Sequence, residues 1–122
     1  MSARSVAVTF FNLTSHDLIL DTSSVQLQHG EWKRYPPSII PSLQYGEWES
    51  DSDGIYTGTQ GSLQYQFQYN GIQNIPISWD DPYYGGNSYG ISCSSSDFKT
   101  RYAGGDGDNA VVQFFIDQKG SD

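Results

Sequence analysis

Hydrophobic and polar residues alternate along several short segments of the chain, which is the pattern of half-buried β-strands. The clearest alternation covers residues 62–69, where serine and glutamine occupy one face. The apolar face consists of Leu63, Tyr65, Phe67 and Tyr69. This strand is expected to end at Asn70-Gly71, because that dipeptide is the strongest short signal for a hairpin. Residues 75–79 are then expected to pair back across it.

The segment from residue 6 to 11 is largely apolar on both faces. This predicts a central strand that is covered on two sides. A turn-rich stretch follows, and residues 18–20 form a second short apolar run. We expect these two strands to make the first hairpin, with a long loop between them.

Further short strands are predicted at 23–28, 45–49, 89–93, 98–102 and 110–116. Residues 35–41 contain three prolines, which remove ladder donors, so an extended crossover is expected there. Turns or loops are expected at 50–54 and 80–88, and a frayed tail at 118–122. About nine short strands separated by turn signals predict an antiparallel β-sandwich.

Composition supports an all-β chain, because 13 glycines, nine tyrosines, six phenylalanines and three tryptophans favour strands and turns. A length of 122 residues is that of one domain, expected to span 1–122. Cys93 is the one cysteine, which excludes an internal disulfide and a multi-cysteine zinc site. No stretch has the ~20 consecutive apolar residues of a membrane-spanning helix.

The charge of −8, from 14 acidic and six basic residues, changes the expected partners. Nucleic-acid phosphates and anionic lipid headgroups both repel such a surface. We therefore expect no nucleic-acid partner, and expect any membrane contact to involve neutral or zwitterionic lipid, or a receptor. The N-terminal residues lack the apolar core of a secretory signal, which predicts synthesis without a signal peptide.

Residues with catalytic or metal-binding chemistry are few and poorly patterned. His16 and His29 lie in turn-like surroundings, and Cys93 is expected to be a small buried hydrophobe. The acidic pairs Glu47/Glu49 and Asp51/Asp53 have the residue types of a glycosidase, but a spacing of two is common by chance in an acidic chain. The sequence predicts no cofactor and no catalytic residue.

Calcium is a weak metal candidate. The segment from Gly104 to Asn109 offers Asp106 and Asp108 as oxygen ligands on a flexible turn. A tight glycine turn between the last two strands explains the same residues without a metal.

The most informative segment is residues 79–89, where four aromatic residues alternate with loop-forming glycine, proline, asparagine and aspartate. Trp79 is expected to be a core anchor. Tyr83 and Tyr84 are adjacent and follow Pro82, so at least one of them is expected to be exposed. Tyrosine and tryptophan favour wet interfaces, including lipid headgroups, so this loop is a candidate contact site.

Several segments together resemble the aegerolysin family, and most of all the ~14-kDa component of binary insecticidal crystal proteins. The similarity covers nearly the whole chain, in order. It is carried by Met1-Ser2-Ala3-Arg4, Asn12, Thr14, His16, Leu18, Leu20, Gly30-Glu31-Trp32, Glu49-Ser50, Ser52-Asp53-Gly54, Thr57-Gly58-Thr59-Gln60-Gly61, Trp79-Asp80-Asp81-Pro82-Tyr83, Gly85, Asn87, Gly104-Gly105 and Gly107. Gln60 stands where the family usually has Glu, and Asp81 where the insecticidal group has Asn, so lipid or receptor preference is not carried over.

The resemblance implies a β-sandwich of the aegerolysin and cytolysin type that recognises membranes without enzymatic activity or cofactor. It also implies a larger partner protein that builds a pore, and an insect midgut target for the insecticidal pairs. We would then expect production in the cytoplasm or a crystal inclusion, followed by release and action at the target-cell membrane.

Two functional hypotheses follow, and a glycosidase ranks below both. In the first, the protein is the membrane-recognising component of a pore-forming toxin, with Tyr83, Tyr84 and Tyr89 inserted at headgroup level and Trp32 as a second candidate. In the second, it is a lectin whose aromatic faces stack on sugar rings. Its hydroxyl-binding residues would be Asp80, Asp81 and Asn87. Self-association by pairing of sheet edges is a further possibility for a sandwich.

Overall fold

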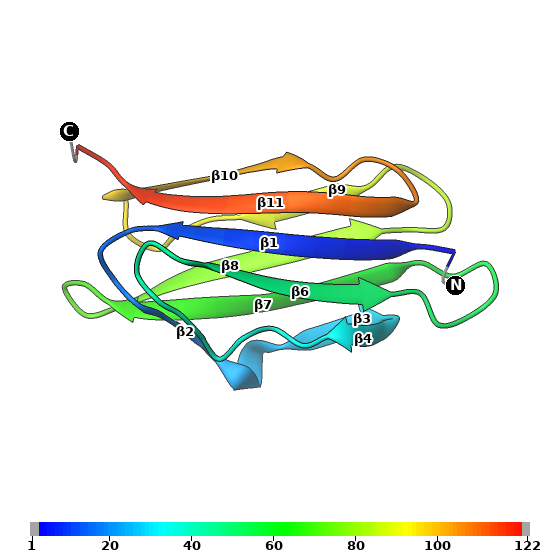
Figure 1. Cartoon of the computed structure of the whole chain (residues 1–122), viewed down its shortest axis with the longest axis horizontal. Coiled ribbons are helices and arrows are strands. Elements are labelled where there is room, and N and C mark those ends of the chain that lie inside the picture. Colours follow the sequence, from blue (N-terminus) through cyan, green and yellow to red (C-terminus); the bar gives the residue numbers. More distant parts are fainter. Residues whose placement is uncertain (1–2, 121–122) are drawn as a thin grey trace.

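The computed structural model describes residues 3–120 and consists of two β-sheets packed into a sandwich (Figure 1). One sheet has the strand order β10-β11-β1-β6-β4, and the other has the order β5-β2-β7-β8-β9, with β3 also pairing to β7. The strands are β1 (Ser5–Leu13), β2 (Leu18–Leu20), β3 (Gln26–His29), β4 (Glu31–Arg34), β5 (Ile39–Ile40), β6 (Tyr45–Asp51), β7 (Thr59–Gln68), β8 (Ile72–Asp81), β9 (Ser88–Ile91), β10 (Phe98–Gly104) and β11 (Asn109–Gln118). The predicted all-β sandwich is confirmed.

The hairpin of β7 and β8 also agrees with the prediction. The strands pair antiparallel from Thr59–Asp81 to Gln68–Ile72. Asn70 and Gly71 both have positive φ angles, of 52° and 96°, in the turn between them. Asparagine and glycine tolerate this left-handed backbone, so the sequence fixes the turn and the turn fixes the register.

The predicted hairpin between residues 6–11 and 18–20 is wrong. β1 lies between β11 and β6, parallel to the first and antiparallel to the second, whereas β2 belongs to the other sheet. The buried Asn12 holds the crossing point, because its side-chain amide donates to the carbonyls of His16, Ile40 and Pro41 at 2.7, 3.1 and 3.1 Å. β1 therefore pairs with strands that are distant in the sequence instead of with β2, and the buried Asn12 amide supports this arrangement.

The expectation that β1 is covered on both faces is also wrong. Its inner face is buried, but Ala7, Thr9 and Phe11 on the outer face are half-buried and lie under no further layer. Rings on the two neighbouring strands cover Phe11 instead. It stacks on Phe115 with ring centroids 5.1 Å apart, and its centroid lies 5.8 Å from that of Tyr45.

The core lies between the sheets and is rich in large rings. Its largest fully buried side chains are Trp48, Trp79, Tyr65, Phe10 and Phe114. Trp79 is 1% exposed, as predicted, and its Nε1 donates to Ser50 Oγ at 3.0 Å. Burial of each such ring contributes on the order of 2–3 kcal/mol, so the rings hold the two sheets rigidly together.

Several element boundaries differ from the prediction. Ser50 and Asp51 belong to β6, and Asp80 and Asp81 end β8 rather than begin a loop. The sequence did not predict β4, and the proline-rich segment expected as a crossover contains the two-residue strand β5. A frayed tail was expected from residue 118, but Gln118 belongs to β11 and the Lys119 amide donates to the Asp97 carbonyl; residues 121–122 lie outside the described part.

One end of the sandwich gathers the N-terminal segment and the loops β6–β7, β8–β9 and β10–β11 (Figure 1). The opposite end carries the β7–β8 turn and the connections around residues 14–17 and 41–44. Within residues 3–120, helical structure long and apolar enough to span a bilayer is absent.

Candidate functional site

An exposed apolar cluster lies at the N-terminal end of the sandwich. It consists of Ile55 and Tyr56 from the β6–β7 loop and Tyr83 and Tyr84 from the β8–β9 loop, and we call it the aromatic tip. Ile55, Tyr56 and Tyr84 are 83%, 68% and 79% exposed, and Tyr83 is half-buried. The exposure of Tyr84 confirms the prediction that at least one of the paired tyrosines faces solvent.

The three tyrosine rings of the aromatic tip touch one another edge to face. The ring centroids of Tyr56 and Tyr83 lie 5.3 Å apart, and those of Tyr83 and Tyr84 lie 4.9 Å apart. The two loops therefore form one continuous surface in which Tyr83 is the central ring.

Tyr56 is displayed by a strained backbone. Among residues 3–120, only Leu43, Tyr56 and Asn70 have positive φ without being glycine, and Tyr56 has a φ of 56°. A bulky side chain in this conformation costs about 1–3 kcal/mol and occurs mostly where the surrounding structure enforces it. Here the strain serves to place a tyrosine ring outward, at 68% exposure.

Short contacts hold the β6–β7 loop in this position. Thr57 Oγ1 donates to the Gly54 carbonyl at 2.8 Å and accepts from the Gly54 amide at 3.0 Å. Gly58 lies so close to the β8–β9 loop that a Cβ there would overlap the Asp81 carbonyl oxygen and come within 2.7 Å of Pro82 Cα. The absence of a side chain at residue 58 thus lets the two loops meet.

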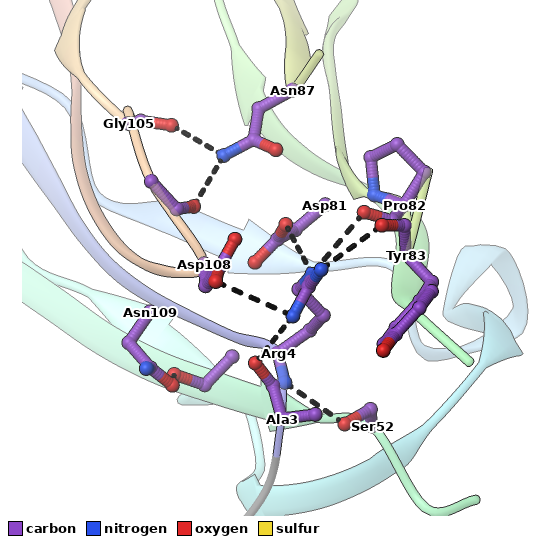
Figure 2. A network of polar contacts seen from close by, with 12 residues as sticks. Ala3, Arg4, Ser52, Asp81, Pro82, Tyr83, Asn87, Gly105, Asp108 and Asn109 are labelled. Atoms are coloured by element: carbon purple, nitrogen blue, oxygen red, sulfur yellow. Dashed lines mark hydrogen bonds and ion pairs between the residues drawn. The ribbon is translucent and has the colours of Figure 1, made fainter. Parts of the chain in front are cut away.

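Arg4 anchors the β8–β9 loop from below (Figure 2). Its guanidinium donates to the carbonyls of Tyr83 and Pro82 at 2.9 and 3.4 Å, and its Cζ lies 4.4 Å from the centroid of the Tyr83 ring. Ser52 fixes the backbone of Arg4 in turn. The Arg4 N–H donates to Ser52 Oγ at 3.0 Å, and the Ser52 N–H donates to the Arg4 carbonyl at 2.9 Å. One arginine therefore ties the N-terminal segment, β8 and the tip into a rigid unit.

Asp81 lies beneath this arginine and is 1% exposed. Its Oδ1 is 3.9 Å from Arg4 Nε, and its Oδ2 is buried with no hydrogen-bond partner among the described residues. Burial raises the pKa of the Asp81 carboxyl to about 6, although the Arg4 charge opposes that rise. Asp81 is thus a structural counter-charge, and it is not accessible to a sugar or a lipid as the lectin hypothesis requires.

Tyr89 and Trp32 are half-buried, and their ring contacts are with residues outside the aromatic tip. Tyr89 packs against Phe114 and Tyr102, and its hydroxyl donates to the Gly105 carbonyl at 2.7 Å. Trp32 on β4 contacts Trp79 with ring centroids 5.9 Å apart, and it packs against the core. Both aromatic residues are partly buried and pack against the core at this end of the sandwich.

Asn87 and Asp108 shape the neighbouring β10–β11 loop. The Asn87 amide donates to the carbonyls of Gly105 and Gly107, each at 2.8 Å (Figure 2). Asp108 Oδ2 lies 3.5 Å from Arg4 Nη1, and Asp106 is exposed. Residues 3–120 contain no group of three or more histidine, cysteine or acidic side chains placed to hold a metal ion.

The other candidate residues have structural contacts. The His16 ring packs against Phe67 and Phe98, and Cys93 is half-buried, which raises the pKa of its thiol. Glu47 and Glu49 lie 3.3 and 3.8 Å from Arg34 and Lys33 on the outer face of the sheet. Asp80 is half-buried beside the tip, and burial raises the pKa of its carboxyl.

Sequence reasoning missed Arg4, Ile55 and Tyr56 as parts of the site. Ile55 and Tyr56 follow the acidic turn directly, and an apolar pair inside a polar loop was the available signal. Arg4 offered no such signal, because its partners are about 80 residues away along the chain.

Comparison with solved structures finds this fold elsewhere. The chain superposes on the lipid-binding protein Nakanori with a TM-score of 0.85 at 14% identity, over 97% of this chain and 73% of that one. It superposes on RahU, solved with a TRIS molecule, with a TM-score of 0.78 at 20% identity over all of both chains. The corresponding values for IP-1A from Alcaligenes faecalis are 0.73 and 15%, over 99% and 95%.

Comparison of sequences gives less information about the chain than comparison of structures does. No protein-family model matches the chain. An uncharacterised protein of Dictyostelium discoideum is 29% identical over 116 residues, which are 95% of this chain and only 10% of that protein. The chain therefore spans about a tenth of the curated relative that it matches. Together the solved structures establish that the chain has the aegerolysin-type β-sandwich fold, which it shares with a lipid-binding protein.

Proposed function

We propose that this protein recognises membranes without catalysing a reaction, and that the aromatic tip is its membrane-contacting surface. The observation that carries the proposal is the exposed cluster formed on two loops by Ile55, Tyr56, Tyr83 and Tyr84. Arg4 anchors one of these loops, and the missing side chain at Gly58 lets the other approach it. A lipid-binding protein of the same fold supports it.

The chemistry of the tip suits the headgroup region of a bilayer. Tyrosine has an apolar ring and a polar hydroxyl, and it is enriched where membrane meets water. Because Arg4 stacks on Tyr83 and the loops are fixed, little conformational entropy is lost when the surface docks.

Charge selects the kind of lipid. The acidic residues Asp53, Asp80, Asp106 and Asp108 lie on the loops and strand ends around the tip, and the whole chain carries −8. These carboxylates repel anionic headgroups. The tip is therefore expected to prefer neutral or zwitterionic lipid, or a membrane receptor.

We further propose that the protein is one component of a pore-forming toxin, of the binary insecticidal type, and that a larger partner protein builds the pore. The similarity of segments across the chain to that group supports this role. The strands that the structure describes within residues 3–120 all pair within the two sheets of the sandwich.

A lectin is the second candidate function, and a hollow beside the tip favours it. The hollow has a volume of about 400 Å³ and is lined by Tyr56, Tyr83 and Tyr84 together with His29, Gln60 and Asp80. Rings next to hydrogen-bonding side chains are what a sugar requires. A glycan array separates the two functions, because a lectin binds without lipid and is inhibited by free sugar.

Vesicle co-sedimentation tests the proposal. The wild type is expected to sediment with neutral phosphatidylcholine–sphingolipid vesicles, and the double variant Tyr56→Ala/Tyr84→Ala is expected to lose at least tenfold in partitioning. Tyr45→Ala is the matched control, because Tyr45 is 57% exposed at the far end of β6. Equal binding by the double variant and the wild type would remove the aromatic tip from the mechanism.

A further inference from the structure

Exposed apolar side chains also gather at the end of the sandwich opposite the aromatic tip. This end carries the turn between β5 and β6, the turn between β7 and β8, and the crossing from β1 to β2 (Figure 1). Its exposed large hydrophobic residues include Leu13, Ile19, Leu43, Tyr45 and Ile72, which are 44–71% exposed. Leu13 and Tyr45 lie on the outer face of one sheet, whereas Ile19 and Ile72 lie on the outer face of the other. Exposed apolar residues on the β2–β7–β8 side, together with Leu43, mark an interaction site.

Leu43 is the most exposed of these residues, and its backbone is strained. It is 71% exposed and has a φ of 63°, a conformation that favours glycine or asparagine. An exposed leucine at this position is not stabilised by burial, and its backbone conformation is unfavourable. A contact outside the molecule is therefore the best explanation for its side chain.

The loop that displays Leu43 is rigid. Ser42 N–H donates to Asp17 Oδ1 at 2.9 Å, and Ser42 Oγ donates to the Thr14 carbonyl at 2.6 Å. The buried Asn12 amide holds the Pro41 carbonyl at 3.1 Å, and the Gln44 amide donates to the same carbonyl at 3.1 Å. Leu43 is therefore a fixed apolar projection rather than the tip of a loose loop.

A hollow lies next to this projection. It has a volume of about 380 Å³, and its apolar walls are Ile19, Phe67 and Ile72. Asp17, which holds the Leu43 loop through Ser42, also lines the hollow. An apolar projection therefore lies close to a hollow whose apolar walls are joined by the polar side chains of His16, Gln66 and Gln68.

We propose that this end is a self-association surface, on which Leu43 of one copy enters the Ile19–Phe67–Ile72 hollow of a second copy. A two-fold interface brings the same patch of both copies together, so it needs a projection and a matching recess beside each other. The hollow is larger than a leucine side chain, and the twofold axis would make the contact twice.

The charge distribution favours a second copy at this end over the tip. Two chains of −8 repel each other, so they can approach only where local charge is low. This end carries Asp17, Asp97 and Asp117 among the described residues. However, Asp17 accepts from Ser42, Lys99 lies opposite Asp117, and the Lys119 amide donates to the Asp97 carbonyl, so the local net charge is low. The tip end, by contrast, carries Asp51, Asp53, Asp106 and Asp108 on its loops and strand ends.

Sedimentation-velocity centrifugation over about three decades of protein concentration tests this proposal without any membrane. The wild type is expected to shift from monomer to dimer as concentration rises. Leu43→Asn is expected to weaken dimerisation at least tenfold, because it removes the projection. Its urea midpoint should be unchanged or higher, because asparagine tolerates this backbone conformation, and this readout excludes loss by misfolding.

Two further variants complete the test. Ile72→Asp places a charge on the wall of the hollow and is expected to weaken dimerisation as Leu43→Asn does. Ile55→Asn changes an even more exposed residue at the tip, 83% against 71% for Leu43, and should leave dimerisation unchanged. A wild type that stays monomeric throughout, or a Leu43→Asn variant that dimerises normally, would overturn the proposal and leave this surface to a different protein. Vesicle binding by the aromatic tip is measured separately and can fail or succeed independently.

Discussion

The guanidinium of Arg4 stacks on the ring of Tyr83, with its Cζ 4.4 Å from the ring centroid, while Asp81 lies buried on its other side, 3.9 Å from Nε. These contacts among the Tyr83 ring, the Arg4 guanidinium and the Asp81 carboxylate join the first described residues of the chain to the loop that bears the exposed tyrosines. It explains how a loop with two glycines after Tyr84 keeps a fixed shape.

Arg4→Ala is expected to destabilise the fold by about 2–4 kcal/mol, because it leaves the Asp81 carboxylate buried without its counter-charge. Urea unfolding measures this loss. The double variant Arg4→Ala/Asp81→Asn should recover part of the stability, since it removes the stranded charge as well. Additive losses in the double variant would show that the two residues are not coupled.

The stability of the fold is expected to rise as the pH falls from 7 to about 5. The pKa of Asp81 is raised to about 6 in the folded chain, so the folded state binds more protons than the unfolded state between this value and the ordinary value of 3.8. Unfolding free energy therefore increases as the pH falls through 6, by about 1–2 kcal/mol.

Urea midpoints at pH 7.5 and 5.0 measure this effect. Lower net charge also favours the compact state in acid, so Asp81→Asn is the control that isolates the contribution of this carboxyl. A smaller pH dependence in Asp81→Asn is the expected result. The same slope in both proteins would assign the effect to other groups.

Tyr89→Phe is expected to reduce stability by about 1 kcal/mol, because the Tyr89 hydroxyl donates to the buried side of the β10–β11 loop at the Gly105 carbonyl. Vesicle binding should not change, since Tyr89 packs within the end of the sandwich. Tyr102→Phe is a matched control on the neighbouring ring, 47% exposed. A large loss of vesicle binding in Tyr89→Phe would restore Tyr89 to the contact surface.

Asn87→Ala is expected to cost about 1–2 kcal/mol, because its amide satisfies the carbonyls of both Gly105 and Gly107. Millimolar calcium should leave the thermal unfolding midpoint of the wild type unchanged, since this amide and Arg4 already organise the loop that carries Asp106 and Asp108. A calcium-dependent rise in the midpoint that is lost in Asp108→Asn would instead identify a cation site.

Local patterns in the sequence predicted local structure well. The alternation before Asn70-Gly71 gave both the strand and its turn, because side-chain period and turn chemistry are properties of neighbouring residues. The exposure of Tyr84 followed from two adjacent tyrosines after a proline in the same way.

Long-range pairings were not predictable from one sequence. The parallel pairing of β1 with β11 joins residues about a hundred positions apart, and nothing local distinguishes it from a hairpin with β2. The burial of Asp81 has the same origin, because its environment depends on Arg4 from the other end of the chain. Tyr56 joined the site only because Gly58 lets its loop approach Pro82.

Fluorescence quenching by brominated lipid tests most directly whether the aromatic tip enters the membrane. In Tyr84→Trp, a new indole replaces a side chain that is 79% exposed, while in Tyr45→Trp the indole lies at the opposite end. Vesicles of brominated phosphatidylcholine are expected to quench the added fluorescence of Tyr84→Trp and to leave that of Tyr45→Trp unchanged. Equal quenching of both, or quenching of Tyr45→Trp alone, would contradict a membrane-docking tip.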